Sequence, residues 1–360
     1  MRFPEFIEEW DQKSISDVAN VVGGGTPDTT IAEYWDGNIQ WFTPSEIGKS
    51  KYISKSERKI TQSGLNNSSA KILPQGTILL STRATIGECS IAMEECSTNQ
   101  GFQSLISKSN YNSEFVYYLI QTKKKDLIRN ACGSTFLEIS ANEVRKIKCR
   151  VPQINEQDKI TQLLSLIDKR IATQNKIIQQ LQSLIKGIVV SVTAETPNTR
   201  IDKCLACHSS TLQENQIEAI GNSPVYGANG ICGYTDNADF NEPAILIVKD
   251  GSGVGNVRYV SGQYSAIGTQ NILTSQNEYC LKYIYFCLQA FNFVPYKTGM
   301  AIPHIYFKDY GKAKIYCPKY EKQIEITKQI ENIEKKIEIE TTLLNKYEEQ
   351  KKFLLSNMFI

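Results

Sequence analysis

The chain has 360 residues, of which 41% are hydrophobic and 22% charged, and its formal net charge is +2. This length exceeds one comfortable core and fits two domains, and the composition is typical of a globular protein and excludes a disordered one. Residues 1–12 contain no apolar run, and no stretch reaches the roughly 18 uncharged apolar residues of a membrane span. We therefore expect a cytoplasmic protein with no membrane contact, whose ten cysteines are reduced thiols.

In chain order, short apolar runs punctuated by Gly and Pro predict strands, and a helical pattern follows them. In the first half the strand candidates are residues 71–82, 87–94 and 102–107, and the helix candidate is residues 114–130. In the second half the strand candidates are residues 242–250, 255–260 and 270–275, and the helix candidate is residues 278–291. Both halves are therefore predicted to be α+β domains with a strongly curved sheet.

The two halves also align with each other towards their carboxyl ends. A constant offset of 166 residues (283 − 117) matches one half to the other without a gap. The matched pairs include Tyr117/Tyr283, Gly133/Gly299, Pro152/Pro318, Gln157/Gln323, Ile160/Ile326 and Ile167/Ile333. Upstream the offset drifts, although 78–87 still resembles 245–255 and 98–107 resembles 268–275. Such repetition indicates a duplicated unit of one domain and one helix.

A heptad-patterned helix follows each domain, because positions spaced alternately by four and three are almost all apolar, as a coiled-coil seam requires. The first seam comprises Ile160, Leu164, Ile167, Ile171, Gln174, Ile178, Leu181, Ile185, Ile188 and Val192. The second comprises Ile326, Ile330, Ile333, Ile337, Glu340, Leu344, Tyr347, Lys351, Leu354 and Met358, with Lys351 the least regular. Gln174 and Glu340 coincide at the offset, so antiparallel pairing would bring them into one polar layer that sets the register. The alternative is that both are tolerated at a solvated rim.

Proline marks the helix limits, because Pro152 and Pro318 stand just before the two helices and cannot lie within them. We predict domains at 1–152 and 197–318, and helices at 153–196 and 319–360. A helix of about 40 residues would be roughly 60 Å long. The predicted fold is α+β, with two mixed α/β domains joined by two long antiparallel coiled-coil helices in pseudo-two-fold symmetry.

Three basic clusters in the first half could face phosphates, and they could equally be solvated surface. They comprise Lys49, Lys51, Lys55, Arg58 and Lys59; Lys123, Lys124, Lys125 and Arg129; and Arg145, Lys146, Lys148 and Arg150.

Several patterns that suggest chemistry have simpler explanations. CLACH at 204–208 matches a haem-attachment pattern, but the expected cytosolic location disfavours haem. Zinc would require a second Cys/His pair, and the only other histidine is His304. The glycines at 23–25 and 251–255 lack the spacing of phosphate-binding loops and are interpreted as turns. Asp28, Glu57 and Lys59 can be forced into a nuclease-like pattern that chance often supplies. We therefore predict no catalytic and no metal-binding residues on this chain.

Four segments resemble the target-recognition domain and conserved helix of the type I restriction–modification specificity subunit. They are GGGTPDTTIAEYWDGNIQWFTPSEIG (23–48), GTILLSTRATIG (76–87), STNQGFQSLI (97–106) and VPQINEQDKITQLLSLIDKRI (151–171). The second half lacks the GGTP-type opening and carries YGANG at 226–230 instead. The resemblance implies that each domain reads one half of a bipartite double-stranded DNA site through the major groove.

The resemblance also implies partners that carry the chemistry. The helices would dock two DNA adenine methyltransferase subunits, and motor–nuclease subunits would join that complex. S-adenosylmethionine, ATP and Mg would then belong to these partners, with no cofactor on this chain. A different function remains open, namely a coiled-coil scaffold with protein-binding end domains.

Loops beside the glycine turns are where we expect DNA contacts, from side chains that can donate or accept hydrogen bonds at base edges. In the first domain the candidates are Thr26, Lys49, Arg83, Gln100, Ser134 and Thr135. In the second domain they are Tyr226, Asn229, Lys249, Gln270, Lys297 and His304.

Overall fold

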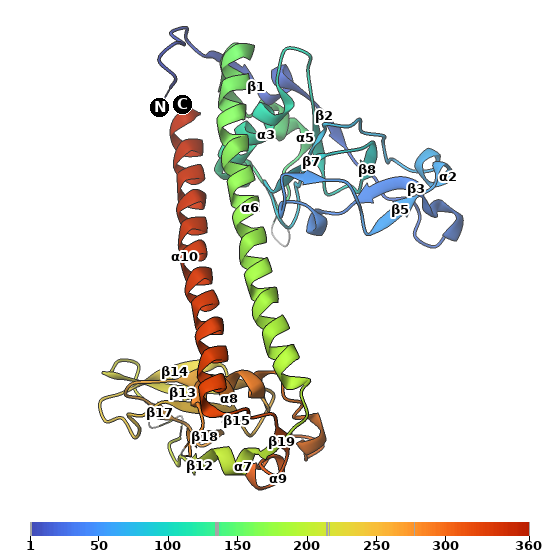
Figure 1. Cartoon of the computed structure of the whole chain (residues 1–360). Coiled ribbons are helices and arrows are strands. Elements are labelled where there is room, and N and C mark those ends of the chain that lie inside the picture. The colour runs from blue at the N-terminus through green and yellow to red at the C-terminus, as the bar shows by residue number, and fades with distance from the viewer. Residues whose placement is uncertain (1, 134–136, 214, 216, 277, 360) are drawn as a thin grey trace. The chain divides into compact units, whose positions relative to one another are not determined.

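The structure is a computed structural model that describes residues 2–133, 137–213, 215, 217–276 and 278–359. The chain divides into two compact units, Met1–Thr173 with Leu344–Ile360 and Gln174–Leu343. Each unit contains one mixed α/β domain and one part of each long helix (Figure 1).

The first domain is built on a five-stranded sheet in the order β2-β9-β6-β7-β4, with a three-stranded sheet β5-β3-β8 beside it. A separate antiparallel pair, β1 with β10, joins its first and last strands. The strands are β1 (Asp11–Ser14), β2 (Ala19–Gly23), β3 (Trp35–Phe42), β4 (Tyr52–Ile53), β5 (Arg58–Ile60), β6 (Ile78–Leu80), β7 (Cys89–Ala92), β8 (Cys96–Thr98), β9 (Gln103–Ser107) and β10 (Lys148–Val151). The helices are α1 (Ile15–Val18), η1 (Ala32–Tyr34), η2 (Pro44–Glu46), α2 (Gln62–Asn66), α3 (Ser113–Thr122), α4 (Lys124–Arg129) and α5 (Ala141–Lys146).

The second domain has a four-stranded sheet β12-β18-β15-β16, a three-stranded sheet β14-β13-β17 and the pair β11-β19. The strands are β11 (Thr199–Arg200), β12 (Leu205–Ser209), β13 (Ser223–Gly227), β14 (Gly230–Thr235), β15 (Ala244–Val248), β16 (Val257–Val260), β17 (Ser265–Ala266), β18 (Gln270–Ser275) and β19 (Lys314–Ile315). The helices are α7 (Ile201–Cys204), α8 (Leu281–Gln289), η4 (Val294–Tyr296) and α9 (Phe307–Tyr310).

The two domains share one strand plan. The order β12-β18-β15-β16 corresponds to β2-β9-β6-β7, and β14-β13-β17 corresponds to β5-β3-β8. In both three-stranded sheets one antiparallel and one parallel pairing meet on the middle strand. Ala19 pairs with Ser107 and Leu205 pairs with Ser275, so the two registers coincide as well. The predicted α+β fold with two mixed domains is confirmed.

The apolar runs form the predicted strands because every residue of β6, β7 and β15 is buried. Apolar runs that do not alternate with polar residues are typical of strands that are covered on both faces. The helix expected over 114–130 is two helices, α3 and α4, which are separated at Lys123. The side chain of Asn112 caps α3 by accepting hydrogen bonds from the amides of Glu114 and Phe115.

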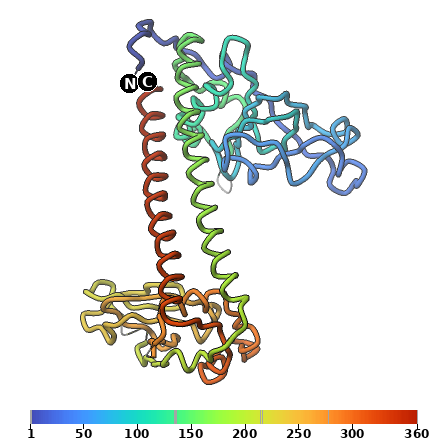
Figure 2. Tube along the Cα trace, viewed as in Figure 1, coloured from blue at the N-terminus to red at the C-terminus, as the bar shows by residue number. Residues whose placement is uncertain are grey.

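The long helices are α6 (Ile154–Thr193) and α10 (Tyr320–Met358), and every predicted seam position on them is buried or half-buried. Within each unit they pair antiparallel. In the first unit Trp10 packs edge-on against Phe359, with ring centroids 6.3 Å apart, so the first residues of the chain cover the end of α10 (Figure 2). Among the described residues, no helix is long and apolar enough to cross a membrane.

Candidate nucleic-acid interface

In each domain, a central strand of the larger sheet leads into a turn that ends on a glycine. After β6 the turn ends at Gly87, whose amide donates to the carbonyl of Ser81 at 3.0 Å. After β15 it ends at Gly255, whose amide donates to the carbonyl of Val248 at 2.9 Å. Both glycines have positive φ, +88° and +93°, which side-chain-bearing residues rarely adopt. The sequence match of Gly87 with Gly255 is therefore a match of backbone geometry.

A second loop closes against this turn in both domains. Reciprocal backbone hydrogen bonds join Cys132 to Glu138, both at 2.9 Å, and Thr298 to His304, at 2.9 and 2.8 Å. These positions differ by the same offset of 166 residues (298 − 132 and 304 − 138). These hydrogen bonds join the two ends of the loop in each domain.

A side-chain pair ties this loop to the glycine turn, with its acidic and basic members exchanged between the domains. In the first domain Arg83 of the turn binds Glu138 of the loop, with Nε and Oε1 2.8 Å apart. In the second, Asp250 of the turn lies 3.2 Å from Nδ1 of His304 in the loop. The same cross-link is thus built from different residues.

The described contact residues of the first domain lie in three places: Thr26 with Gln100, Arg83 in the glycine turn, and Lys49 before β4. The Thr26 hydroxyl donates to Gln100 Oε1 at 2.5 Å, so two of these residues meet although they are far apart in sequence. Arg83 is exposed in the glycine turn and bound to the neighbouring loop. Ser134 and Thr135 lie outside the described residues.

Three of the predicted residues of the second domain gather beside its glycine turn. Lys249 follows β15, and its carbonyl accepts a hydrogen bond from the amide of Ile305 at 2.9 Å, next to His304. Lys297 is exposed and precedes the closed loop. Lys249 is half-buried, so its side chain has less access to solvent than that of Lys297.

The other predicted residues of the second domain lie elsewhere. Asn229 is exposed in the tight turn between β13 and β14, and Tyr226 on β13 packs edge-on against a buried tyrosine ring. Gln270 is only 2% exposed and corresponds through the strand register to Phe102, not to Gln100. This placement corrects the expectation of a surface side chain, since an amide buried in the sheet has no access to a base.

The segment at 226–230 also corrects an expectation from the sequence. It is the end of β13, the turn and the first residue of β14, and it therefore corresponds to the β3 region of the first domain. Gly23 ends β2, Gly24 and Gly25 follow it, and the counterpart of β2 is β12.

The polar seam residues contact each other in the second unit. The Gln174 amide donates to the Glu340 carboxylate and, at 3.2 Å, to the Glu340 main-chain carbonyl. Both residues are buried. Hydrogen bonds from Lys336 and then from Gln174 hold the pKa of Glu340 below its ordinary value. The layer is a hydrogen-bonded contact within the helix pair, as a register-setting layer requires.

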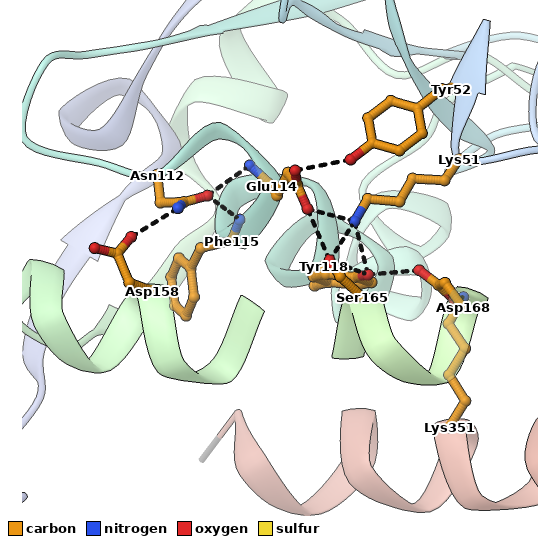
Figure 3. Close-up of polar contacts among 10 residues, drawn as sticks. All are labelled: Lys51, Tyr52, Asn112, Glu114, Phe115, Tyr118, Asp158, Ser165, Asp168 and Lys351. Atoms are coloured by element: carbon orange, nitrogen blue, oxygen red, sulfur yellow. Dashed lines mark hydrogen bonds and ion pairs between the residues drawn. The ribbon is translucent and has the colours of Figure 1, made fainter. Parts of the chain in front are cut away.

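One lysine of the first basic cluster, Lys51, is half-buried, and its side chain is only 9% exposed. The Lys51 ammonium donates to Glu114 at 2.5 Å, to Ser165 at 2.8 Å and to Tyr118 at 2.9 Å (Figure 3). We call these four residues the Lys51 network, and it joins the start of β4 to α3 and α6. Lys49, two positions earlier in the chain, is exposed.

Burial lowers the pKa of Lys51, and the hydrogen bond to Glu114 partly offsets this. Burial alone would raise the pKa of Glu114, but hydrogen bonds led by Lys51 bring it below its ordinary value. Tyr118 also donates to Asp168 at 2.5 Å, and Asp168 pairs with Lys351 of α10 at 2.8 Å. The irregular seam residue Lys351 therefore has a partner and does not interrupt the helix pairing.

The second domain is attached to its helix by a different lysine. Lys282 of α8 lies 3.0 Å from Glu331 and 3.5 Å from Glu334, both on α10. Burial opposes its charge, but the two carboxylates raise its pKa above the ordinary value. Both domains therefore use a lysine to contact a long helix, at positions that are not equivalent in the repeat. Lys51 bonds the Ser165 hydroxyl of α6, whereas Lys282 pairs with two carboxylates of α10.

The CLACH segment is part of the fold. Cys204 ends α7 and is buried with its Sγ 3.8 Å from that of Cys317, while His208 on β12 lies 2.9 Å from the Thr274 hydroxyl on β18. The ten cysteines are thiols. Among the described residues, no group of three or more His, Cys, Asp or Glu could hold a metal ion.

Local structure also accounts for two residues of the nuclease-like pattern. Asp28 accepts hydrogen bonds from the amide and hydroxyl of Thr30, at 2.9 and 2.7 Å, as in a turn. Lys59 lies on β5, paired with Gln40 of β3. The third residue of the pattern, Glu57, is exposed.

Comparison with known proteins matches both copies of the repeat to one family. The family described as the type I restriction modification DNA specificity domain matches residues 7–183 and 207–349, which is more than half of the chain. The chain belongs to this family. Both halves that the internal offset identified are specificity domains, and each match extends into a long helix.

Curated relatives carry specificity-subunit names. The chain is 40% identical over 184 residues to the type I restriction enzyme MjaIX specificity subunit of Methanocaldococcus jannaschii, covering 48% of this chain and 42% of that protein. It is 28% identical over 175 residues to the EcoR124I/EcoR124II specificity subunit of Escherichia coli, covering 47% and 43%. With the EcoprrI specificity subunit of Escherichia coli the identity is 24% over 343 residues, covering 87% and 84%. The chain thus spans less than half the length of the first two relatives.

Solved structures share the fold of this specificity-domain chain. The S subunit of a type I restriction-modification system from M. genitalium superposes with a TM-score of 0.61 at 16% identity, covering 100% of this chain and 98% of that one. A chain from a structure of type I R-M complex assembly superposes with a TM-score of 0.64 at 13% identity, covering 99% and 98%. At these identities the likeness concerns the fold.

Proposed function

We propose that this chain is the DNA sequence-specificity subunit of a type I restriction–modification complex and acts in the cytoplasm. Each domain reads one half of a bipartite site on double-stranded DNA, and the chain has no catalytic activity of its own. The observation that carries the proposal is the duplicated turn-and-loop construction. Two family-matched domains present the same backbone geometry, at Gly87 and Gly255, with different side chains around it.

This combination suits the reading of two different half-sites. A constant backbone places a loop at the same position on each domain, while the side chains at that position decide which base edges they can bond. Arg83 with Glu138 in one domain and Asp250 with His304 in the other are an instance of such divergence on one frame.

We propose that the long helices dock two DNA adenine methyltransferase subunits and that motor–nuclease subunits join through them. Several large apolar side chains remain exposed on α6 and α10, and exposed apolar surface on a helix suits a protein partner. They are Leu166 and Phe353 in the first unit and Leu184, Val190 and Ile339 in the second. S-adenosylmethionine, ATP and Mg are assigned to those partners.

The test is co-expression with the cognate methyltransferase subunit in a host that lacks adenine methylation, followed by mapping of methylated adenines. The expected result is a single bipartite motif with a constant spacer, and no methylation by either subunit alone. Methyl transfer or cleavage by this chain alone would refute the proposal. Co-purification without any methylated motif would favour the protein-binding scaffold.

A further inference from the structure

The loop that closes between Thr298 and His304 presents apolar side chains to solvent. Met300 is 107% exposed, the highest value among the exposed large hydrophobic residues that the structure describes, and Ile302 is 59% exposed. Large apolar side chains are seldom left in water without a binding role when they occur together. Met300 and Ile302, which we call the tip of the loop, are not among the predicted DNA contacts. The predicted residues Lys297 and His304 only flank the tip.

The backbone of the loop is held in place on both sides. Besides the Thr298–His304 hydrogen bonds, the amide of Gly251 donates to the carbonyl of Pro303 at 3.0 Å. Gly299 has φ +87°, and a Cβ there would approach the Ile302 carbonyl to 2.3 Å. The turn therefore requires glycine, and the two apolar side chains project from a fixed support. Little ordering entropy remains to be lost when such a loop binds.

The charges around the loop favour a polyanionic partner. The chain contains no Asp or Glu between Glu278 and Asp309, whereas Lys297 and Lys308 are exposed on either side of the tip. The acidic group at the base, Asp250, is occupied by His304. An apolar tip flanked by cations is complementary to DNA, where phosphates lie on both sides of apolar base surface.

We infer that Met300 and Ile302 contact the bases of the half-site read by the second domain, with Lys297 bonding the adjacent backbone phosphates. This inference rests on the proposed function. Apolar side chains read bases through thymine methyl groups or the faces of base steps, and both contacts depend on base identity. The tip is therefore a specificity determinant that uses shape and apolar contact.

The equivalent positions of the first domain differ in part. The offset of 166 residues aligns Met300 with Ser134 and Ile302 with Phe136 (300 − 134 and 302 − 136). One of the two apolar positions therefore carries a hydroxyl residue in the first domain, and the other stays apolar.

The experiment uses the full chain co-expressed with its methyltransferase subunit and compares M300A/I302A with the wild type. Adenine-methylation mapping gives the motif, and gel-shift titration measures affinity for a duplex carrying the wild-type motif and for an unrelated duplex. I220A is the matched control, because Ile220 is 85% exposed in the same unit and outside the loop. Thermal unfolding checks that all variants are folded.

We expect M300A/I302A to lose or relax base preference in one half-site only. Its affinity for the motif duplex should fall about tenfold or more, and that for the unrelated duplex should change less. K297A should weaken binding to both duplexes and reduce the salt dependence by about one phosphate contact.

Three results would overturn the inference: an unchanged motif with affinity within about twofold, an equal loss on both duplexes, or loss of the methyltransferase subunit from the purified complex. If the wild-type complex methylates no bipartite motif, the proposed function itself fails.

Discussion

Lys51 offers the sharpest test of how the first domain is attached to its helices. The substitution K51M keeps most of the apolar stem and removes three hydrogen bonds, to Glu114, Tyr118 and Ser165. A hydrogen bond to a charged group contributes about 1.5–3 kcal/mol to stability. Part of this loss is offset, because the variant no longer has to desolvate an ammonium group. We expect a net loss of about 2 kcal/mol, which is about 4–8 °C in melting temperature for a unit of this size.

Tryptophan fluorescence isolates this unit, because Trp10, Trp35 and Trp41 are the three tryptophans of the chain and all lie in it. Urea unfolding of K51M, E114Q and the double variant closes a double-mutant cycle, for which we expect a coupling of about 1–2 kcal/mol. K49M changes an exposed lysine two positions away and should shift stability by less than about 0.5 kcal/mol. Additive losses in the cycle, or an equal loss in K49M, would show that the Lys51 network does not join β4 to the helices.

Three further outcomes are expected. G255A should lower the free energy of unfolding in urea by about 1–2 kcal/mol, and by more than G262A does. Both glycines have positive φ, but only at Gly255 would an added Cβ approach a neighbour, the Cβ of Phe293 at 3.2 Å. Equal losses would show that this close approach does not contribute. Because folding lowers the pKa of Glu114, its ionised carboxylate stabilises the folded unit above the unfolded pKa near 4.5, and this stabilisation is lost as pH falls through the lower folded pKa. In E114Q the free energy of unfolding of the first unit, measured by tryptophan fluorescence, should therefore fall less between neutral and acidic pH. An unchanged fall would contradict a stabilising role of ionised Glu114. In the second unit, Q174L alone should lower the melting temperature measured by circular dichroism, because it removes the Gln174 hydrogen bond from Oε2 of the buried Glu340 carboxylate and leaves only the contact of Oε1 with Lys336. Q174L/E340L should restore or raise the melting temperature, and a double variant as unstable as the single one would argue against the polar layer.

The acid–base pair at the base of the recognition loop shows how the duplicated domains diverged. Arg83 and Glu138 in one domain have Asp250 and His304 as counterparts in the other, so both members of the pair differ. A change at one position alone would have left two groups of like charge side by side, or an unpaired group. Loop position was thus retained while the residues that hold it were exchanged.

Periodicity and offset in the sequence determined the domain–helix–domain–helix order and the seam positions. An α-helix places residues three and four apart on one face whatever it packs against, so the seam from Ile160 to Val192 could be derived without coordinates. The buried strands followed from unbroken apolar runs. The glycine match of Gly87 with Gly255 followed because a positive φ restricts residue type locally.

Tertiary structure decided which polar side chains are available to a partner. Lys49 and Lys51 cannot be told apart in a basic segment of the sequence. The side chain of Lys51 is 9% exposed because β4 pairs with β7 next to α3 and α6, where Glu114 and Ser165 accept its hydrogen bonds. Gln270 resembles Gln100 in sequence, yet strand register places it inside the sheet. Register depends on pairing between distant segments, which local patterns do not encode. For the same reason the sequence does not predict the closed loop that presents Met300, because this loop depends on the pairing of Thr298 with His304.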